Sequence, residues 1–346
     1  MKPLSAFAFT ALPTRVIFGR GKLAETAAEA KGLGMARPFV ITGKNQADIG
    51  RTLATSVNGH AYAGAAMHTP VAVTEAALAV LKEEGCDGTI ALGGGSSTGL
   101  GKAIAFRTDL PQIVIPTSYA GSEMTNILGE TADGAKTTKR DAKIQPETVI
   151  YDPALLDSLP SSFAATSGMN AIAHAVEGLY AVDGNPIVSL MAEEGIRALA
   201  AALPQGKSGH DEALYGAWLC GTVLGSVSMA LHHKLCHVLG GTFNLPHAET
   251  HTVILPHATA YNAVGADAAM ARIARALGTA TAAGGLFDLA QRLGAPTSLK
   301  QLGLTEEALD RAATLAVASP YPNPRPLEQG ALRQLLQNAY DGRRPA

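Results

Sequence analysis

Short apolar runs alternate with alanine-rich amphipathic stretches through the first half of the chain. The apolar runs are rich in β-branched residues and lie at 16–19, 38–43, 89–95, 112–117 and 148–152. Between them, the stretches 22–34 and 69–85 have the spacing of helices and end in glycine. Apolar strands that alternate with helices predict a mostly parallel sheet with helices on both faces.

The strand pattern disappears after about residue 154. Long alanine- and leucine-rich segments follow instead, at 165–182, 187–203, 211–240, 266–278, 284–293 and 328–339. We therefore expect an α/β domain at 1–154 and an all-helical domain at 155–346. A turn signal at Asp133-Gly134 predicts an antiparallel hairpin before the last strand of the first domain.

Composition and charge narrow the class of protein. Of 346 residues, 47% are hydrophobic and 16% are charged, which supplies a large core and argues against disorder. A net charge of −2 gives no bulk attraction to nucleic acid or to an anionic membrane. Three scattered cysteines predict no disulfide framework and fit a reducing cytoplasm. The first residues make a poor signal peptide, and no apolar run reaches the roughly 18 residues of a membrane span.

The segment ALGGGSSTGLGKAIA follows an apolar strand and opens a helix. Gly93, Gly94 and Gly95 let the backbone approach a phosphate closely, and Ser96 and Ser97 add donors at a helix N-terminus. The spacing differs from the ordinary dinucleotide fingerprint, and a plain strand-to-helix turn is the alternative interpretation. Three consecutive glycines followed by Ser-Ser-Thr favour a phosphate-binding site.

Small polar residues also follow the next strand, where open parallel sheets bind ligands. Four of them lie in IPTSYAGSEMT: Thr117, Ser118, Tyr119 and Ser122. A serine-rich connecting loop is the alternative. An earlier strand ends at Gly43 and Lys44, where a dehydrogenase that prefers NAD often carries an acid. NADPH should therefore be tolerated, and the sequence predicts no strict preference for NAD.

The helical half contains two polar pairs with helical spacing. Asn170 and His174 are four residues apart, and His233 and His237 repeat that spacing. His247 follows a proline after a short loop. A lone histidine is usually a core or surface residue, but five polar groups in this pattern could converge on one spot.

Together these motifs resemble the iron-dependent alcohol dehydrogenase superfamily. The resemblance covers nearly the whole chain and is carried by GGGSSTGLGKAIA, IPTSYAGSEMT, the Asn-x3-His helix, HKLCHVLGGTFNLPH and NPRP. It implies a Rossmann-like N-terminal domain that binds NAD(P) and a helical domain that holds a metal, with the active site in the cleft between them. The family's metal ligands correspond to Asn170, His174, His233 and His247, and His237 corresponds to the histidine near the nicotinamide.

Two positions depart from the family's pattern. Asn170 stands where the family has an aspartate ligand, and Gly99 stands where its GGGSxxD motif has an aspartate. With YAGSEMT and MHTP, these changes resemble one branch of the superfamily, the maleylacetate reductases, which work without a metal. The resemblance implies reduction of maleylacetate to 3-oxoadipate, late in the breakdown of aromatic rings.

An amide at position 170 weakens the case for a metal. A carboxylate partly offsets the charge of Fe²⁺ or Zn²⁺, whereas three neutral histidines and Asn170 leave the cation uncompensated. Three histidines alone do hold Zn²⁺ in some enzymes. Hydride addition to a conjugated alkene creates an enolate, and hydrogen bonds can hold an enolate without a metal. We therefore expect NADH or NADPH as cofactor and no required metal.

The expected roles follow from this chemistry. His237 is expected to donate a proton or to hold the oxyanion, and His233, His174 and His247 would shape the polar pocket. Which histidine delivers the proton stays open. The two carboxylates of the substrate need cations or donors, and the candidates are Lys234, Arg325 and the hydroxyl of Tyr119. Lys234 could equally face solvent, and Arg325 could be structural. Four further residues are expected to be structural: His232, His251, His257 and Cys236.

Three other functions remain open at this point. They are a metal-dependent alcohol dehydrogenase of the same fold, a dehydroquinate-synthase-like lyase and a non-catalytic nucleotide-binding protein. The missing carboxylate and the scarcity of basic residues in the helical half speak against the lyase. We expect a cytoplasmic homodimer without nucleic-acid or membrane partners. Its subunits could pair through residues 1–20, whose AFAFTAL and RVIF resemble strands.

Overall fold

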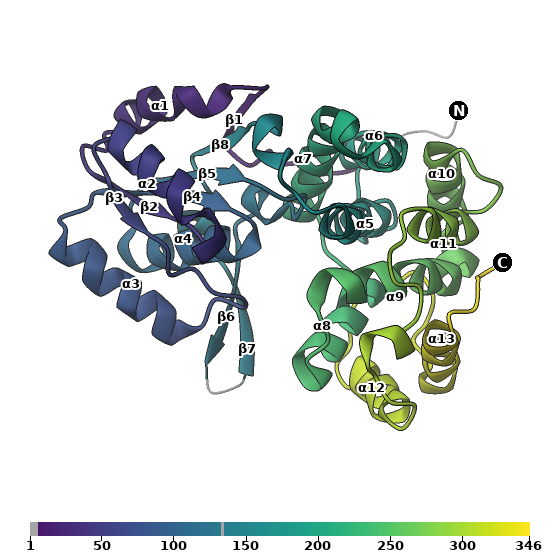
Figure 1. The fold of residues 1–346 in the computed structure, drawn as a ribbon. Coiled ribbons are helices and arrows are strands. Elements are labelled where there is room, and N and C mark those ends of the chain that lie inside the picture. Colours follow the sequence, from purple (N-terminus) through teal and green to yellow (C-terminus); the bar gives the residue numbers. More distant parts are fainter. Residues whose placement is uncertain (1–5, 133–134) are drawn as a thin grey trace. The chain divides into compact units, whose positions relative to one another are not determined.

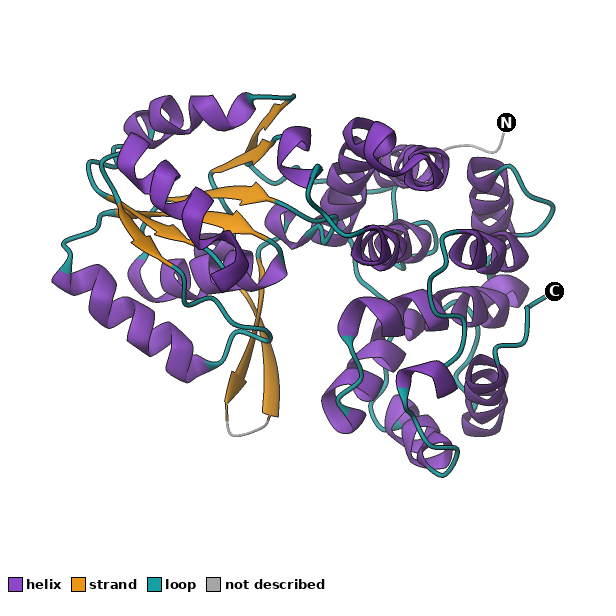
Figure 2. Cartoon of the chain, in the orientation of Figure 1, coloured by secondary structure: helices purple, strands orange, loops and turns teal. Residues whose placement is uncertain are grey.

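A computed structural model describes residues 6–132 and 135–346 of the chain. The chain divides into two compact units (Figure 1). The first runs from Leu12 to Leu159. The second contains Pro160–Ala346 together with the described residues up to Ala11. Figure 2 shows that the strands belong to the first unit and that the second consists of helices and loops.

A six-stranded parallel sheet forms the centre of the first unit, in the order β1-β8-β5-β4-β2-β3. The strands are β1 Arg15–Phe18, β2 Pro38–Ile41, β3 His60–Tyr62, β4 Gly88–Gly93, β5 Gln112–Pro116 and β8 Thr148–Tyr151. Every residue of β2, β4, β5 and β8 is buried, which explains their continuous apolar runs. Five of the six strands confirm the sequence prediction. The short β3, with the sequence HAY, was not predicted.

Helices cover both faces of this sheet. They are α1 Thr26–Gly32, α2 Ala47–Ser56, α3 Val71–Glu83 and α4 Gly95–Thr108. Val40 packs with residues of α1 and α2, whereas its neighbours Phe39 and Ile41 pack with residues of α3 and α4. Successive side chains of a strand point to opposite faces, so α1 and α2 cover one face and α3 and α4 the other (Figure 1).

A separate antiparallel hairpin precedes β8, as the sequence predicts. It consists of β6 Ile127–Ala132 and β7 Ala135–Arg140. The turn expected at Asp133-Gly134 lies outside the described residues. RVIF is β1, which pairs with β8 of the same chain at one edge of the sheet. Pairing of the N-terminal segment across a two-fold axis stays a prediction.

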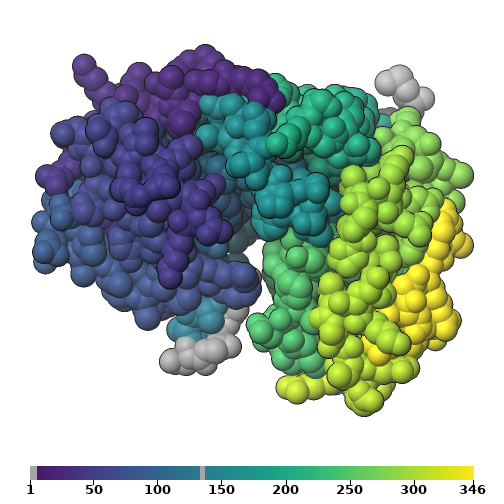
Figure 3. Space-filling model, viewed as in Figure 1, coloured from purple at the N-terminus to yellow at the C-terminus, as the bar shows by residue number. Residues whose placement is uncertain are grey.

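The second unit contains nine α-helices in the described part of the chain. They are α5 Ser161–Gly178, α6 Pro186–Ala202, α7 His210–Ser226, α8 Leu231–Phe243, α9 His247–Asn262, α10 Asp267–Leu277, α11 Ala282–Arg292, α12 Ala308–Val317 and α13 Gln329–Asp341. Every residue of α5 from Ala165 to Gly178 is buried, so this helix forms the centre of the unit. The C-terminal residues, yellow in Figure 3, lie on its surface.

The alanine- and leucine-rich segment at 211–240 is helical, as expected, but it contains two helices. The chain leaves the helix after Ser226 and begins α8 at Leu231. The carboxylate of Asp183 accepts hydrogen bonds from the backbone N–H of Ser228, at 2.9 Å, and from its hydroxyl, at 2.8 Å. This carboxylate comes from the loop after α5, so the break depends on a contact that is distant in sequence.

No single helix in the described part of the chain is long and apolar enough to cross a membrane. The segments Pro186–Ser226 and Leu231–Phe243 are together long and apolar enough, but the chain bends by 94° at the break between them.

Candidate functional site

The glycine-rich turn between β4 and α4 has the geometry that the phosphate prediction requires. Gly93 has a φ of 148°, and a Cβ there would lie 2.4 Å from Ser97 Oγ. A Cβ on Gly94 would lie 3.2 Å from Ser118 Oγ, whereas one on Gly95 would meet no atom within 4 Å. Gly94 is the N-cap of α4, and no side chain caps the helix there. The backbone N–H of Ser97 donates to Gly94 O, which leaves the N–H groups of Gly95 and Ser96 to an anion.

The ends of three strands meet at this turn. The backbone N–H of Thr117, after β5, donates to Gly93 O at 3.0 Å. Gln46, which follows β2, donates from Nε2 to Thr117 Oγ1 at 2.7 Å. Gly93, Gly94, Ser97, Thr117 and Ser118 therefore come together at the carboxyl edge of the sheet, where such sheets bind ligands. We call this set, with Gly95 and Gln46, the glycine cradle.

Other residues predicted for the cofactor site, and Tyr119, predicted for the substrate, follow the same three strands. Ser96 is half-buried in the first turn of α4, and Tyr119 is buried after β5. Burial raises the pKa of Tyr119 well above its usual value, so its hydroxyl stays protonated. Gly43 is the N-cap of a short 3-10 helix that Lys44 begins, and Lys44 is exposed. Sequence analysis missed Gln46, whose only signal was its place two residues after Lys44.

Six histidines of the second unit form one cluster, carried by three helices. The rings of His174, on α5, and His233, on α8, stack with their centroids 5.2 Å apart. His237 lies one turn further along α8, with its centroid 6.3 Å from that of His233. The ring of His251, on α9, is 5.0 Å from that of His233 and 4.3 Å from that of His247. We call these residues, with His232, the histidine cluster.

Glu177 is the carboxylate of this cluster, and the sequence analysis did not single it out. It is fully buried on α5, three residues after His174. It accepts hydrogen bonds from the backbone N–H of Ala230 at 2.9 Å and of His232 at 2.8 Å. It also lies 2.7 Å from Nδ1 of His233. This bond leaves Nε2 as the free nitrogen of that ring. Glu177 is the single Asp, Glu, Lys or Arg of α5, and this was the signal that could have revealed it.

The remaining buried imidazoles are neutral at physiological pH. Burial, with the neighbouring histidines, lowers the pKa of His174, His232 and His251 well below the usual value. His232 Nε2 and His251 Nδ1 lie 3.0 Å apart, which fits a hydrogen bond between two neutral rings. The Cys236 thiol is 3.7 Å from His232 Nε2, and burial raises its pKa well above the usual value. His232, His251 and Cys236 are therefore neutral groups that pack against one another.

Asn170 lies one turn before His174 and is buried. Its Oδ1, His174 Nδ1 and His233 Nε2 have no hydrogen-bond partner among the described residues. A divalent cation needs charge compensation, but an amide and imidazole ligands supply no negative charge, and Glu177 is already bonded to α8. Among the described residues, one group of three His, Cys, Asp or Glu side chains has its ligand atoms all within 4.8 Å of one another. It consists of His232, Cys236 and His251, and none of these stands at a ligand position of the family. The residues at the family's ligand positions do not fit the metal that the resemblance implies.

The two basic residues predicted for the substrate lie in different places. Lys234 is half-buried on α8, with Nζ 5.9 Å from the centroid of the Tyr321 ring. Arg325 lies over the ring of Tyr261, 4.2 Å from its centroid. It lines a cavity with His257, which is ten residues after His247 on α9 and so about 15 Å further along that helix. The structure brings Lys234 near the histidine cluster, and Arg325 lies away from it.

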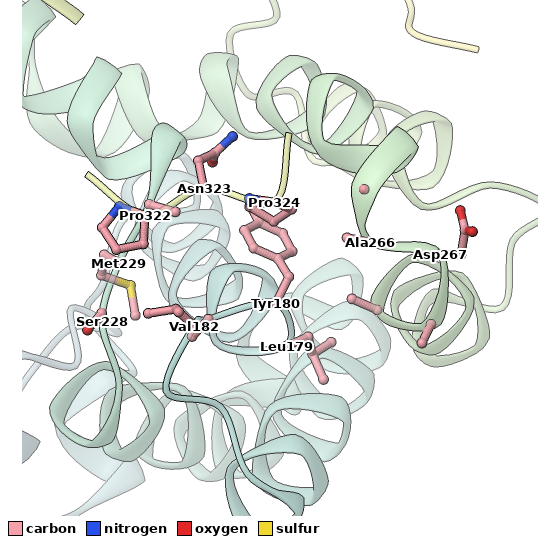
Figure 4. Close-up of a pocket in the computed structure, with 15 residues that line it drawn as sticks. Leu179, Tyr180, Val182, Ser228, Met229, Ala266, Asp267, Pro322, Asn323 and Pro324 are labelled. Carbon is pink, nitrogen blue, oxygen red and sulfur yellow. The ribbon is translucent and has the colours of Figure 1, made fainter. Parts of the chain in front are cut away.

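The NPRP segment supports the start of α8. Asn323 Oδ1 accepts a hydrogen bond from the backbone N–H of Leu231 at 3.3 Å, and its Nδ2 donates to Asn262 Oδ1 at 2.7 Å. Figure 4 shows Asn323 on the wall of a cavity of about 490 Å³, together with Tyr180 and Met229. None of the residues predicted for the site lines this cavity.

Comparisons with known proteins cover both units. A family model described as "Iron-containing alcohol dehydrogenase" matches residues 13–153, and "Fe-containing alcohol dehydrogenase family, C-terminal" matches residues 164–340. The maleylacetate reductase of Burkholderia cepacia is 53% identical over 99% of this chain and 100% of its own length.

Solved structures give the same picture. The maleylacetate reductase of Agrobacterium tumefaciens is 51% identical and superposes with a TM-score of 0.96, over 99% of this chain and 100% of that one. A putative alcohol dehydrogenase from Ralstonia eutropha JMP134 is 54% identical with a TM-score of 0.97, over the same shares.

Replacing Gly95 by alanine tests the glycine cradle. The new Cβ meets no atom of the protein within 4 Å, so the melting temperature should not fall. It would narrow the approach of a pyrophosphate to the α4 N-terminus, and we expect the Kd for NADH to rise about tenfold. Gly32→Ala, at another open helical glycine, is the matched control and should leave binding unchanged. Equal NADH affinities for the two variants, measured by fluorescence titration, would contradict the assignment.

Replacing Glu177 by alanine tests its structural role. The change leaves backbone N–H groups and an imidazole without their partner, so the free energy of unfolding should fall by about 3 kcal/mol. Glu194→Ala removes a carboxylate from an exposed pair with Arg197 and should cost less than about 1 kcal/mol. Urea denaturation of both variants measures the difference. Similar losses of unfolding free energy in the two variants would show that the buried carboxylate of Glu177 stabilises the fold no more than an exposed one does.

Proposed function

The chain belongs to the iron-containing alcohol dehydrogenase family and to its maleylacetate reductases, and we propose that it reduces the conjugated C=C bond of maleylacetate. It is an NAD(P)H-dependent oxidoreductase. In this proposal the product is 3-oxoadipate, the electron donor is NADH or NADPH, and no metal is required. The observation that carries the metal-free reading is the uncharged amide of Asn170 beside buried, neutral imidazoles.

The dinucleotide would be held at the glycine cradle. A Cβ on Gly93 would clash with Ser97, so the backbone itself forms the surface that a pyrophosphate could approach. Thr117 and Ser118 place hydroxyl groups beside it. When bound, the reduced nicotinamide supplies a hydride. No acid stands at Gly43 or Lys44 to repel a 2′-phosphate, which supports the use of both NADH and NADPH.

A neutral pocket suits a substrate with two carboxylates. An aspartate at position 170 would repel such a dianion unless a cation lay between them, whereas an amide can donate a hydrogen bond to a carboxylate. Lys234, half-buried on the same helix as His233, would supply a positive charge. In this proposal, an amide in place of the family's aspartate has two effects. It favours binding of the dianionic substrate, and it removes the negative charge that a metal would need.

Hydride addition to the carbon beta to the ketone moves charge onto the ketone oxygen and gives an enolate. His237 and His247 are the exposed imidazoles of the histidine cluster, and His237 would donate a hydrogen bond to that oxygen. The alpha carbon then needs a proton. In this proposal His233 delivers it from Nε2 after that nitrogen has taken up a proton from solvent, and the Glu177 carboxylate, bonded to Nδ1, balances the charge of the resulting imidazolium. The balance is one hydride and one proton added across the C=C bond.

One observation favours a second candidate, a metal-dependent alcohol dehydrogenase. Asn170 Oδ1, His174 Nδ1 and His233 Nε2 are buried without partners among the described residues, and such atoms could face a common ligand. In the proposed function that ligand is the substrate. The two candidates differ in whether activity depends on a metal.

Metal dependence of wild-type protein separates them. We expect oxidation of NADH and of NADPH with maleylacetate, at rates that a strong chelator does not change. The same purified sample should contain far less than one iron or zinc ion per chain by elemental analysis. Stoichiometric metal that leaves together with activity would support the alcohol dehydrogenase instead.

Asn170→Asp extends this test within the same assay. The added carboxylate should raise Zn²⁺ retention to near one ion per chain and lower kcat/KM for maleylacetate at least about tenfold. Asn185→Asp is the matched control, because aspartate is as good an N-cap as asparagine at the start of α6. It should change neither metal content nor activity. If Asn170→Asp changed neither Zn²⁺ retention nor kcat/KM, the charge at position 170 would not determine metal binding or substrate reduction.

A further inference from the structure

A lysine is fully buried inside the first unit. Lys102 lies on α4 and is 1% exposed. Its Nζ donates to the carbonyl oxygens of Thr125 at 2.6 Å and Ile127 at 3.1 Å, to the hydroxyl of Thr125 at 2.9 Å, and to the carbonyl oxygen of Ser122. An ammonium has three N–H donors, so the whole hydrogen-bonding capacity of Lys102 goes to three residues, Ser122, Thr125 and Ile127, at the end of one loop and the start of β6.

That loop connects β5 with β6 and borders the glycine cradle. Its first residue, Thr117, donates from its backbone N–H to Gly93 O, and Ser118 Oγ lies close to Gly94. Lys102 fixes the other end of the loop to α4, seven residues after Gly95 and so about 10 Å along the helix. Both ends of the loop are thus attached to the helix whose N-terminus forms the cradle.

A buried charge at this place has a cost. Burial lowers the pKa of Lys102 to about 7, and the buried carboxyl of Glu123 offsets part of this. The hydroxyl of Tyr151 donates to Glu123 Oε1 at 2.9 Å and holds that carboxyl in turn. An apolar side chain could fill the same volume without the desolvation cost. The hydrogen bonds to the loop are what the lysine adds.

We infer that Lys102 is a positioning residue for the dinucleotide site: it holds the β5–β6 loop on α4 so that Thr117 and Ser118 stay over the glycine cradle. Lys102 is fully buried and so acts through the loop. The inference rests on the proposed function only in that a dinucleotide binds at the cradle. Loosening the loop should weaken dinucleotide binding more than it slows turnover at saturating dinucleotide.

Two substitutions of different severity test this role. Lys102→Met keeps an unbranched side chain and removes all the hydrogen bonds of the ammonium, and we expect the Kd for NADH to rise at least about tenfold. Thr125→Val removes one hydroxyl and keeps the shape, and we expect a rise of about three- to tenfold. Thr125→Ser keeps the hydroxyl and should bind NADH within about twofold of wild type.

The measurement is fluorescence titration of NADH without maleylacetate, with kcat at saturating NADH and the melting temperature measured alongside. A larger change in Kd than in kcat, rescued by Thr125→Ser, supports the inference. A lower melting temperature with an unchanged Kd in the variants overturns it, as does equal weakening by Thr125→Val and Thr125→Ser. If Lys102→Met does not fold, the two Thr125 variants decide the question. Normal NADH binding without turnover of maleylacetate would contradict the proposed function and leave Lys102 unaffected.

Discussion

A single buried carboxylate determines how the histidine cluster is built. Glu177 accepts the first backbone N–H groups of α8, where the helix dipole favours negative charge, and it bonds Nδ1 of His233 on the same turn. The chain can therefore leave α7 and restart as α8 without unsatisfied donors. This restart determines which faces of α8 carry His233 and His237. A buried charge needs such compensation, and here the compensation is the start of a helix that carries the functional residues.

The charges of the side chains in and around the histidine cluster connect its structure to the proposed function. Because Glu177 is bonded to the start of α8, the histidine cluster gains no negative charge from it that a cation could use. Asn170 adds none, and burial keeps His174, His232 and His251 neutral. The result is a polar cluster of side chains with little charge of its own. Such a cluster suits a dianionic substrate whose reduction passes through an enolate, and it suits a divalent metal poorly.

Much of this arrangement was predictable from local patterns. β-branched runs predicted five strands of the main sheet, and pairs four residues apart placed Asn170 with His174 and His233 with His237. The three-residue β3 has too little pattern to reveal it. Helix α9 was missed because Pro256 and its polar residues interrupt the expected spacing. The break between α7 and α8 depends on carboxylates from elsewhere in the chain, and no local signal reveals it.

The residues that sequence analysis missed share one physical property. Glu177, Gln46 and Lys102 act through partners far away in sequence, as the bond from Gln46 to Thr117 across 71 residues shows. Spacing along one helix cannot show such contacts. For Arg325 the open alternative was a structural role, and its place over Tyr261 is what that role would require. Its function in the substrate site stays a prediction that no contact in the cluster supports.

The central claim is that Asn170 and the histidine cluster serve reduction of a C=C bond through an enolate. It is tested most directly by following a deuterium label. Maleylacetate would be reduced with a dinucleotide that carries deuterium at the transferring position of the nicotinamide, and the product would be analysed by NMR. The account predicts 3-oxoadipate with one deuterium on the methylene carbon beta to the ketone. Deuterium on a carbon that bears a hydroxyl group would show reduction of the ketone and would contradict it.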